Sequence, residues 1–151
     1  MKKFFMFFGG FTLMFIIIAT TYLGYLHHEG RKLDITSKAY IDTNIPVILS
    51  TWSMDELLKR SGDELWQHLD KNEVNVFFLK MKQLGKMQKY EGSEGESSTD
   101  VSVENGKVIT ARYTASAIFQ NGTAQMKVKL TLKHGQWQIG DFEVSSPILA
   151  K

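Results

Sequence analysis

The chain has 151 residues, of which 43% are hydrophobic and 23% charged, so it can hold one ordinary domain and an appendage but not a multidomain enzyme. It contains no cysteine, which excludes disulfides, thiolate catalysis, cysteine-type zinc sites and lipid attachment through cysteine. Lys2 and Lys3 account for the whole net charge of +2, because the residues after position 26 hold 16 acidic and 16 basic side chains. This balance argues against a nucleic-acid-binding protein.

The N-terminal segment from Phe4 to Leu26 is a run of 23 residues without a charge. As a helix it would extend about 34 Å, enough to cross a hydrocarbon core of about 30 Å. A cleaved signal peptide is the alternative, but its apolar region would be shorter, about 7–15 residues. We therefore expect residues 1–26 to form an uncleaved membrane anchor that contacts the lipid bilayer through residues 4–26.

The two N-terminal lysines favour a cytoplasmic N-terminus. The sequence therefore predicts a single-pass inner-membrane protein whose C-terminal domain, over residues 34–151, is periplasmic or otherwise extracytoplasmic. Residues 27–33 (HHEGRKL) are polar and are expected to form a linker to this domain. His27, His28 and Glu29 are possible metal ligands, but adjacent histidines point apart on a helix and no ligand follows at i+4. No metal or cofactor is predicted.

Three helical segments are expected at the start of the exported domain. Apolar residues near helical spacing predict a helix from Asp34 to about residue 44, and Pro46 predicts a bent or restarted turn after it. Capping-box patterns that begin at Ser53 and Ser61 predict two short helices within 54–69. An amphipathic helix is predicted over 73–84, with Gly85 as its left-handed C-cap. Its apolar face comprises Val74, Phe77, Phe78, Met81 and Leu84.

After Lys86 the hydrophobic period changes from about 3.6 to 2, which predicts antiparallel strands. Turn signals at Asn105-Gly106, Asn121-Gly122 and His134-Gly135 divide this part into four strands. The expected strands cover about 86–104, 107–120, 123–133 and the residues up to Pro147. The first is expected to be interrupted by a loop or bulge over Glu91–Ser98, where glycine, glutamate and serine accumulate.

The fourth strand contains a change of parity. Trp137 and Ile139 have odd numbers, whereas Phe142 and Val144 have even numbers, so both pairs can face one core only if an extra residue lies between them. We predict a β-bulge at Gly140-Asp141.

Helices followed by an antiparallel meander predict an α+β fold, in which helices at 34–49, 54–69 and 73–84 cover one face of a curved four-stranded sheet. The run AYIDTNIPVILSTWSMDELLKRSGDELW (39–66) and the closing strand GQWQIGDFEVSSP (135–147) resemble the cystatin-like, nuclear-transport-factor-2-like superfamily. The closing strand is similar to the G-x-W-x-I-x-x-F ending of small exported members. The resemblance covers residues 34–149 and implies a cone with an open mouth. It implies no single function, because the superfamily includes isomerases, dehydratases, scaffolds and adaptors.

An enzyme of this fold would need an acid or base inside the cone. The candidates are Asp42, Tyr40, Tyr90 and Tyr113. A single Asp on an amphipathic helix is more often solvated, however, and a buried tyrosine is more often part of the core. His68 and His134 lie where exposure is expected, and no P-loop, G-x-S-x-G, H-E-x-x-H or G-x-G-x-x-G motif occurs. We therefore assign no catalytic residue and predict no enzyme.

Two groups of side chains are candidates for binding. The polar face of the third strand carries a stripe formed by Lys127, Lys129 and Lys133. This stripe would contact anionic headgroups or an acidic partner, or would guard the strand against edge pairing. Trp52 and Trp66 flank the short helices, where they would line a ligand site or anchor the core. The sequence assigns none of these residues to a binding site.

The anchor indicates the function. A membrane anchor raises the local concentration of a domain relative to partners in the same membrane. The sequence thus predicts a non-catalytic, protein-binding subunit or accessory factor of an envelope complex. The alternative is a tethered small-ligand-binding protein or isomerase-like enzyme that uses the cone pocket. A third hypothesis is a structural domain that forms a homo-oligomer through the open face of its sheet.

Overall fold

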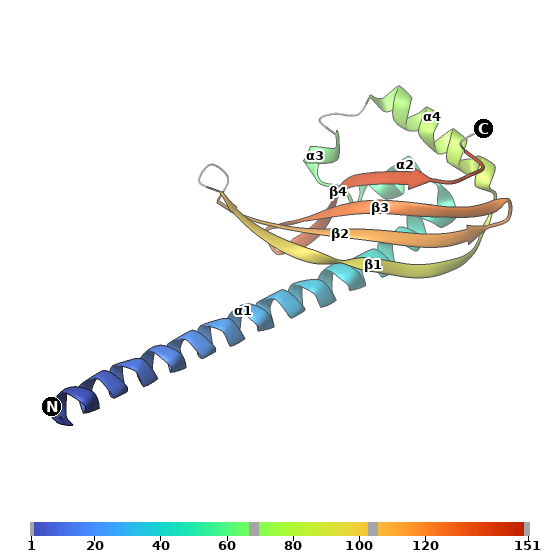
Figure 1. Cartoon of the computed structure of the whole chain (residues 1–151). Coiled ribbons are helices and arrows are strands. Elements are labelled where there is room, and N and C mark those ends of the chain that lie inside the picture. The colour runs from blue at the N-terminus through green and yellow to red at the C-terminus, as the bar shows by residue number, and fades with distance from the viewer. Residues whose placement is uncertain (1, 67–69, 103–105, 150–151) are drawn as a thin grey trace. The chain divides into compact units, whose positions relative to one another are not determined.

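The computed structural model describes residues 2–66, 70–102 and 106–149, and for most of residues 2–28 it describes the backbone alone. The chain divides into two compact units, Met1–Leu33 and Asp34–Lys151. In chain order the elements are α1 (Lys2–Thr51), α2 (Met54–Leu58), α3 (Asp63–Trp66), α4 (Lys71–Met81), the 3-10 helix η1 (Lys82–Leu84), β1 (Met87–Ser102), β2 (Gly106–Phe119), β3 (Gly122–Lys133) and β4 (Gln136–Ser145), as Figure 1 shows. The chain therefore has an α+β fold, with its helices before an antiparallel sheet.

Helix α1 includes the segment predicted as anchor and the segment predicted as linker. Residues 27–33, the predicted linker, are helical, because only Gly30 opposes a helix there, at a cost of about 1 kcal/mol. Most side chains of the predicted anchor, at positions 4–17 and 22–26, lie outside the described residues. Among the residues that are described, no helix combines the length and the apolar character needed to cross a membrane.

Helix α1 continues through Pro46 to Thr51, so the predicted end of this helix near residue 44 is wrong. A proline inside a helix costs about 3 kcal/mol. The helix face beside it is completely buried: Ile41, Ile45, Ile48 and Leu49 have no exposed surface. Burial of one such side chain contributes about 1.5–3 kcal/mol, so the four together outweigh the proline.

The short helices and the amphipathic helix are confirmed, but the side-chain cap predicted at Ser53 is wrong. Ser53 makes no side-chain capping bond, so the expected capping box does not form. The N-cap of α4 is Asp70, whose carboxylate accepts a hydrogen bond from the backbone N–H of Asn72 at 2.8 Å. Gly85 ends η1 at the predicted position, but its backbone angles, φ +78° and ψ −163°, are not those of the left-handed cap that was expected. The apolar face of this segment is buried apart from Phe77, which is half-buried, and His68 lies outside the described residues.

The sheet is a meander in the order β1-β2-β3-β4, with every pair antiparallel. Strand β1 is continuous over Glu91–Ser98. Of the two predictions for this stretch, the loop is therefore wrong and the bulge is confirmed. The register shifts between Met87 and Lys89 and again between Tyr90 and Gly92. Gly92 has φ +101°, a conformation in which glycine carries no Cβ penalty, so the strand absorbs the extra residue and continues.

The predicted bulge in β4 is confirmed. Lys129 pairs with Asp141 and Leu130 pairs with Ile139, which leaves Gly140 without a partner. Gly140 is not among the glycines with positive φ, so the shift in register alone accommodates it. Trp137 and Ile139 are buried before the bulge, and Phe142 and Val144 are half-buried after it.

One face of the sheet forms the core with the helices. The buried side chains on this face are Ala111, Tyr113, Ala115, Ala117, Phe119, Ala124, Met126, Val128, Leu130, Trp137 and Ile139. Trp52 packs on them, with its ring stacked 5.6 Å from Phe119 and tilted 6.4 Å from Phe78. In the view of Figure 1, α2 and the second half of α1 lie behind the strands. The other face of the sheet points toward the viewer.

Candidate functional site

Asp42, the candidate acid or base, lies between α1 and β1. Its carboxylate accepts hydrogen bonds from Tyr90 Oη at 2.9 Å, Ser93 Oγ at 2.6 Å and Lys38 Nζ at 3.0 Å. Burial alone would raise the pKa of Asp42, but the hydrogen bonds from Ser93, Lys38 and Tyr90 outweigh it and hold this pKa below its usual value. Burial, followed by the hydrogen bond to Asp42, raises the pKa of Tyr90 far above its usual value. At neutral pH the carboxylate is therefore ionised and the phenol protonated, a pattern that suits a fixed polar contact.

A second carboxylate on the same helix face also contacts β1. Asp34 accepts hydrogen bonds from the backbone N–H of Ser97 at 2.8 Å and from Ser97 Oγ at 2.5 Å. Between the two carboxylates, Lys38 Nζ donates to the carbonyl oxygen of Ser93 at 2.5 Å. Eight helical residues span about 12 Å, and four strand residues span about 13 Å, so the spacing of Asp34 and Asp42 matches that of Ser97 and Ser93. These contacts form an edge clamp, defined as Asp34, Lys38 and Asp42 on β1.

The candidate tyrosines have three separate partners. Tyr113 Oη lies 2.8 Å from Ser37 Oγ in the core, and Tyr40 Oη donates to the carbonyl oxygen of Arg60 at 3.0 Å. Burial raises the pKa of both phenols. The structure thus brings Tyr90 to Asp42, whereas the hydroxyl groups of Tyr40 and Tyr113 are held at other contacts.

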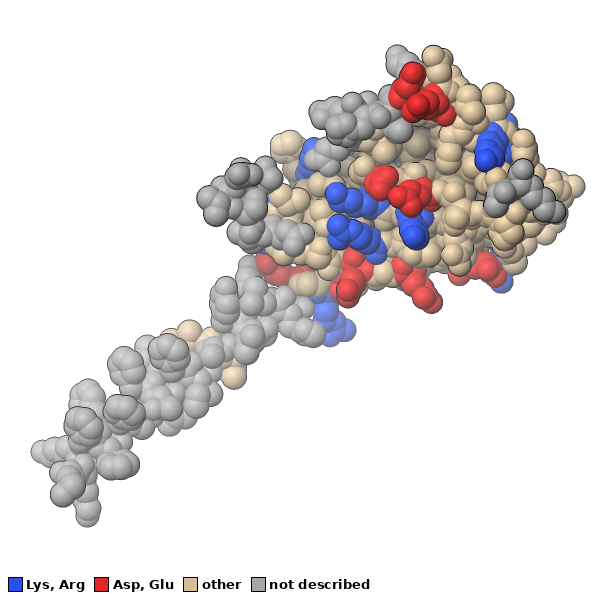
Figure 2. Space-filling view, turned by 45° about the horizontal axis from the view of Figure 1, so that its top comes forward, with Lys and Arg blue, Asp and Glu red and all other residues tan. Residues whose placement is uncertain are grey.

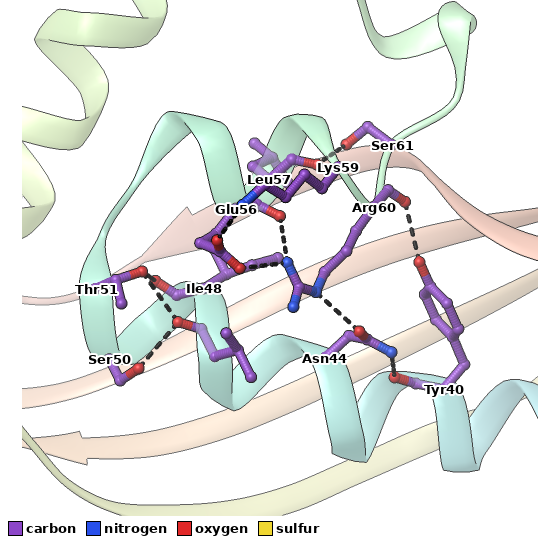
Figure 3. Close-up of polar contacts among 11 residues, drawn as sticks. Tyr40, Asn44, Ile48, Ser50, Thr51, Glu56, Leu57, Lys59, Arg60 and Ser61 are labelled. Carbon is purple, nitrogen blue, oxygen red and sulfur yellow. Dashed lines mark hydrogen bonds and ion pairs between the residues drawn. The ribbon is translucent and has the colours of Figure 1, made fainter.

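Arg60 joins the segment around α2 to α1, as Figure 3 shows. Its Nε donates to Asn44 Oδ1 at 2.8 Å, and its Nη1 donates to the carbonyl oxygen and Oε2 of Glu56 at 2.8 and 2.6 Å. Hydrogen bonds from Lys59 and Arg60 lower the pKa of Glu56. The backbone of the same segment covers part of β4: Ile139 N–H donates to Arg60 O at 2.8 Å, and Gly62 N–H donates to Ile139 O at 3.0 Å. This network positions α2 and occupies one sheet edge.

A small apolar cavity of about 210 Å³ lies between the short helices, α4 and β4. It is lined by Leu57, Leu65, Glu73, Val74, Phe77, Phe78 and Phe142. Trp52 is not among these residues, and its stacking with Phe119 assigns it to the core. The side chain of Trp66 lies outside the described residues. Trp52 is therefore a core residue, and the prediction for Trp66 falls outside the described side chains.

The open face of the sheet carries many charged side chains. It holds a shallow hollow of about 780 Å³. Its charged lining residues are Glu94 and Glu96 on β1, Arg112 on β2, Lys127 and Lys129 on β3, and Asp141 and Glu143 on β4. Figure 2 shows that basic side chains gather in the middle of this face and that acidic side chains lie on both sides of them. We call Arg112, Lys127 and Lys129 the cation cluster.

The cation cluster brings like charges together. Arg112 and Lys129 are direct cross-strand partners, and Lys127 lies two residues from Lys129 on the same strand. Like charges in directly opposite positions destabilise a sheet by a fraction of a kcal/mol. Although carboxylates stand opposite these cations, none of the ion pairs among the described residues includes a member of the cluster. The three cations therefore keep their hydrogen-bonding capacity for another group.

The position of β3 in the sheet excludes one interpretation of the lysine stripe. Because β3 lies between β2 and β4, Lys127 and Lys129 cannot guard a sheet edge, and that interpretation is wrong. Lys133, at the end of β3, does not line the hollow. The position of a strand within a sheet is not encoded in its own alternation pattern, so the sequence could show the stripe but not its place.

The histidines and acidic residues provide no metal centre in the described part of the chain. His134 is exposed in the turn between β3 and β4, at φ +51°. The side chains of His27, His28 and His68 lie outside the described residues. Within those residues, no group of three or more His, Asp or Glu side chains is arranged to hold a metal ion.

Comparison of the chain with known protein families, with curated proteins and with solved structures found no match. The site must therefore be interpreted from its own geometry.

Proposed function

We propose that this chain is a membrane-anchored domain that binds a protein partner through the open face of its sheet. It would act as a non-catalytic subunit or accessory factor of an envelope complex. The charge-free run over residues 4–26 supports an anchor in the inner membrane, with the N-terminus in the cytoplasm and residues 34–151 exported. Helices followed by a four-stranded meander with a bulged last strand support a cystatin-like domain.

The cation cluster is the observation that carries this proposal. Arg112 and Lys129 repel each other across neighbouring strands, on a face that no helix covers in the described residues. An uncharged polar residue such as threonine at position 112 or 129 would keep this face soluble without the repulsion. The sheet has such a residue at Thr114, opposite Lys127. Within the described part of the chain, the carboxylates opposite these cations on β1 and β4 form no ion pair with them, so a partner that supplies negative charge would relieve the repulsion between Arg112 and Lys129.

A photo-crosslinking amino acid at Thr114 tests the proposal in intact cells that express the full chain at its native level. Thr114 is exposed and lines the hollow. We expect a discrete protein adduct that disappears in the Lys127→Glu/Lys129→Glu variant. The matched control carries the probe at Leu79, which is 64% exposed on α4. The absence of any protein adduct at Thr114, or the same adduct at Leu79, would refute the proposed function.

The alternative function, binding of a small ligand or an isomerase substrate, has weaker support. Ligand pockets usually enclose about 300–1,000 Å³. The apolar cavity beside α4 has about 210 Å³ and a single carboxylate, Glu73, among its lining residues. Asp42, the other candidate acid or base, is hydrogen-bonded to three donors. A protein partner therefore remains the function that the geometry supports best.

A further inference from the structure

We infer that the partner places a short acidic segment on the cation cluster. On the open face, this cluster lies between two rows of carboxylates, Glu94 and Glu96 on β1 and Asp141 and Glu143 on β4, which we call the acidic rails. The partner would carry basic side chains on both sides of its acidic segment. This inference rests on the proposed function and specifies the chemistry of the partner. Lys127 and Lys129 lie two residues apart on β3, so their side chains start about 7 Å from each other. An extended segment whose carboxylates are also two residues apart matches this spacing. Arg112, opposite Lys129, adds a planar fork that binds a carboxylate through two hydrogen bonds.

The acidic rails select a narrow partner. Glu94 and Glu96 lie on the strand beyond Arg112, and Asp141 and Glu143 lie on the strand beyond the two lysines. Neighbouring strands are about 4.8 Å apart, so the cations occupy a strip only one strand spacing wide. A bilayer surface or a nucleic-acid backbone extends beyond such a strip and would meet carboxylates on both sides. A single protein segment fits inside it, and basic residues beside that segment would pair with the rails.

A second copy of this chain does not fit the same surface. A two-fold axis parallel to the central strands would place β1 of one copy over β4 of the other, and β2 over β3. Acidic residues would then face acidic residues, and the cation cluster would face itself. Charge complementarity therefore favours a different protein over a homodimer that forms through the open face.

The test is an NMR titration of the isotope-labelled full chain in neutral detergent. The probe is the peptide acetyl-Lys-Thr-Glu-Thr-Glu-Thr-Lys-amide, and its counterpart has every Lys and Glu exchanged. We expect saturable amide shifts confined to the strands around Arg112, Lys127 and Lys129, and affinity that falls as salt increases. The Lys127→Gln/Lys129→Gln variant should bind the probe at least tenfold more weakly. The control variant Lys86→Gln, at an exposed lysine outside the hollow, should bind it unchanged.

Several outcomes would overturn the inference. The inference fails if the probe causes no saturable amide shift, or if the exchanged peptide binds as tightly as the probe. It also fails if the shifts centre on residues away from the cation cluster, or if inorganic polyphosphate gives a stronger response than the probe. The two proposals fail separately. If the Thr114 probe captures a protein whose crosslinked segment lacks closely spaced carboxylates, the inference fails and the proposed function stands. If the Thr114 probe captures no protein, the proposed function itself fails.

Discussion

Gly95 lies on β1 opposite Tyr113 of β2, and its replacement by alanine should disrupt the sheet. A Cβ built on Gly95 would collide with the carbonyl oxygen of Arg112 and would lie 2.8 Å from the Cα of Tyr113. Both obstacles are backbone atoms of a paired strand, so relief requires that the two strands separate. Overpacking of this kind costs about 1–3 kcal/mol, and rigid neighbours place the cost near the upper end.

For a domain of this size, about 3 kcal/mol lowers the melting temperature by roughly 10–15 °C. Thermal unfolding of the full chain in neutral detergent, followed by far-UV circular dichroism, measures this change. Gly62→Ala is the matched control, because its Cβ would lie 2.8 Å from Oε1 of Gln138, the mobile end of a side chain. That variant should lose less than about 1 kcal/mol. Equal losses in the two variants would show that the strands adjust easily and that the collision argument is wrong.

Three further predictions concern polar groups. Asp42→Asn should lower the melting temperature at pH 7 by the equivalent of about 1 kcal/mol. Since the folded pKa of Asp42 lies below its usual value, the ionised clamp stabilises the fold above about pH 4. The difference in melting temperature between the variant and the unmodified protein should therefore shrink as the pH falls through the folded pKa. A difference that stays constant with pH would contradict the clamp. Arg60→Lys should lower the free energy of unfolding, measured in urea, by about 1–2 kcal/mol, because an ammonium group cannot bridge Asn44 and Glu56 as the guanidinium does. An unchanged urea midpoint would count against this bridge. Lys129→Thr should weaken partner binding while it changes stability by less than about 0.5 kcal/mol, since it removes a like-charge pair with Arg112 and an opposite-charge pair with Asp141 together, and a clear loss of stability would show that Lys129 supports the fold.

Features that depend on local periodicity could be predicted from the sequence. The bulge at Gly140 follows from the parity of Trp137 and Phe142, because alternation is a property of the strand itself. The C-cap at Gly85 follows from a glycine at the end of an amphipathic segment. These predictions need only neighbours in the chain, so they do not depend on the tertiary arrangement.

Features that depend on distant partners could not be predicted. The effect of Pro46 was overestimated, because its local cost is outweighed by a buried face that exists only after α1 packs on the sheet. The strand over Glu91–Ser98 resembles a loop in composition, but α1 supplies its edge with partners from Asp34 and Asp42. The spacing of these two carboxylates was visible in the sequence, whereas the matching serines on β1 lie more than fifty residues away.

The edges of the sheet give a final reason to place the partner on its open face. An open four-stranded sheet can recruit a protein by strand addition at an edge or by contact with an uncovered face. On β1, the carbonyl of Ser93 and the N–H of Ser97 are already bonded to α1 side chains. On β4, both the N–H and the carbonyl of Ile139 are hydrogen-bonded to the segment before α3. The N–H of Phe142 donates to the carboxylate of Asp141 at 2.9 Å. Strand addition would have to break these bonds. The cation cluster, whose ion-pairing capacity is unused among the described residues, can accept a partner without such a loss.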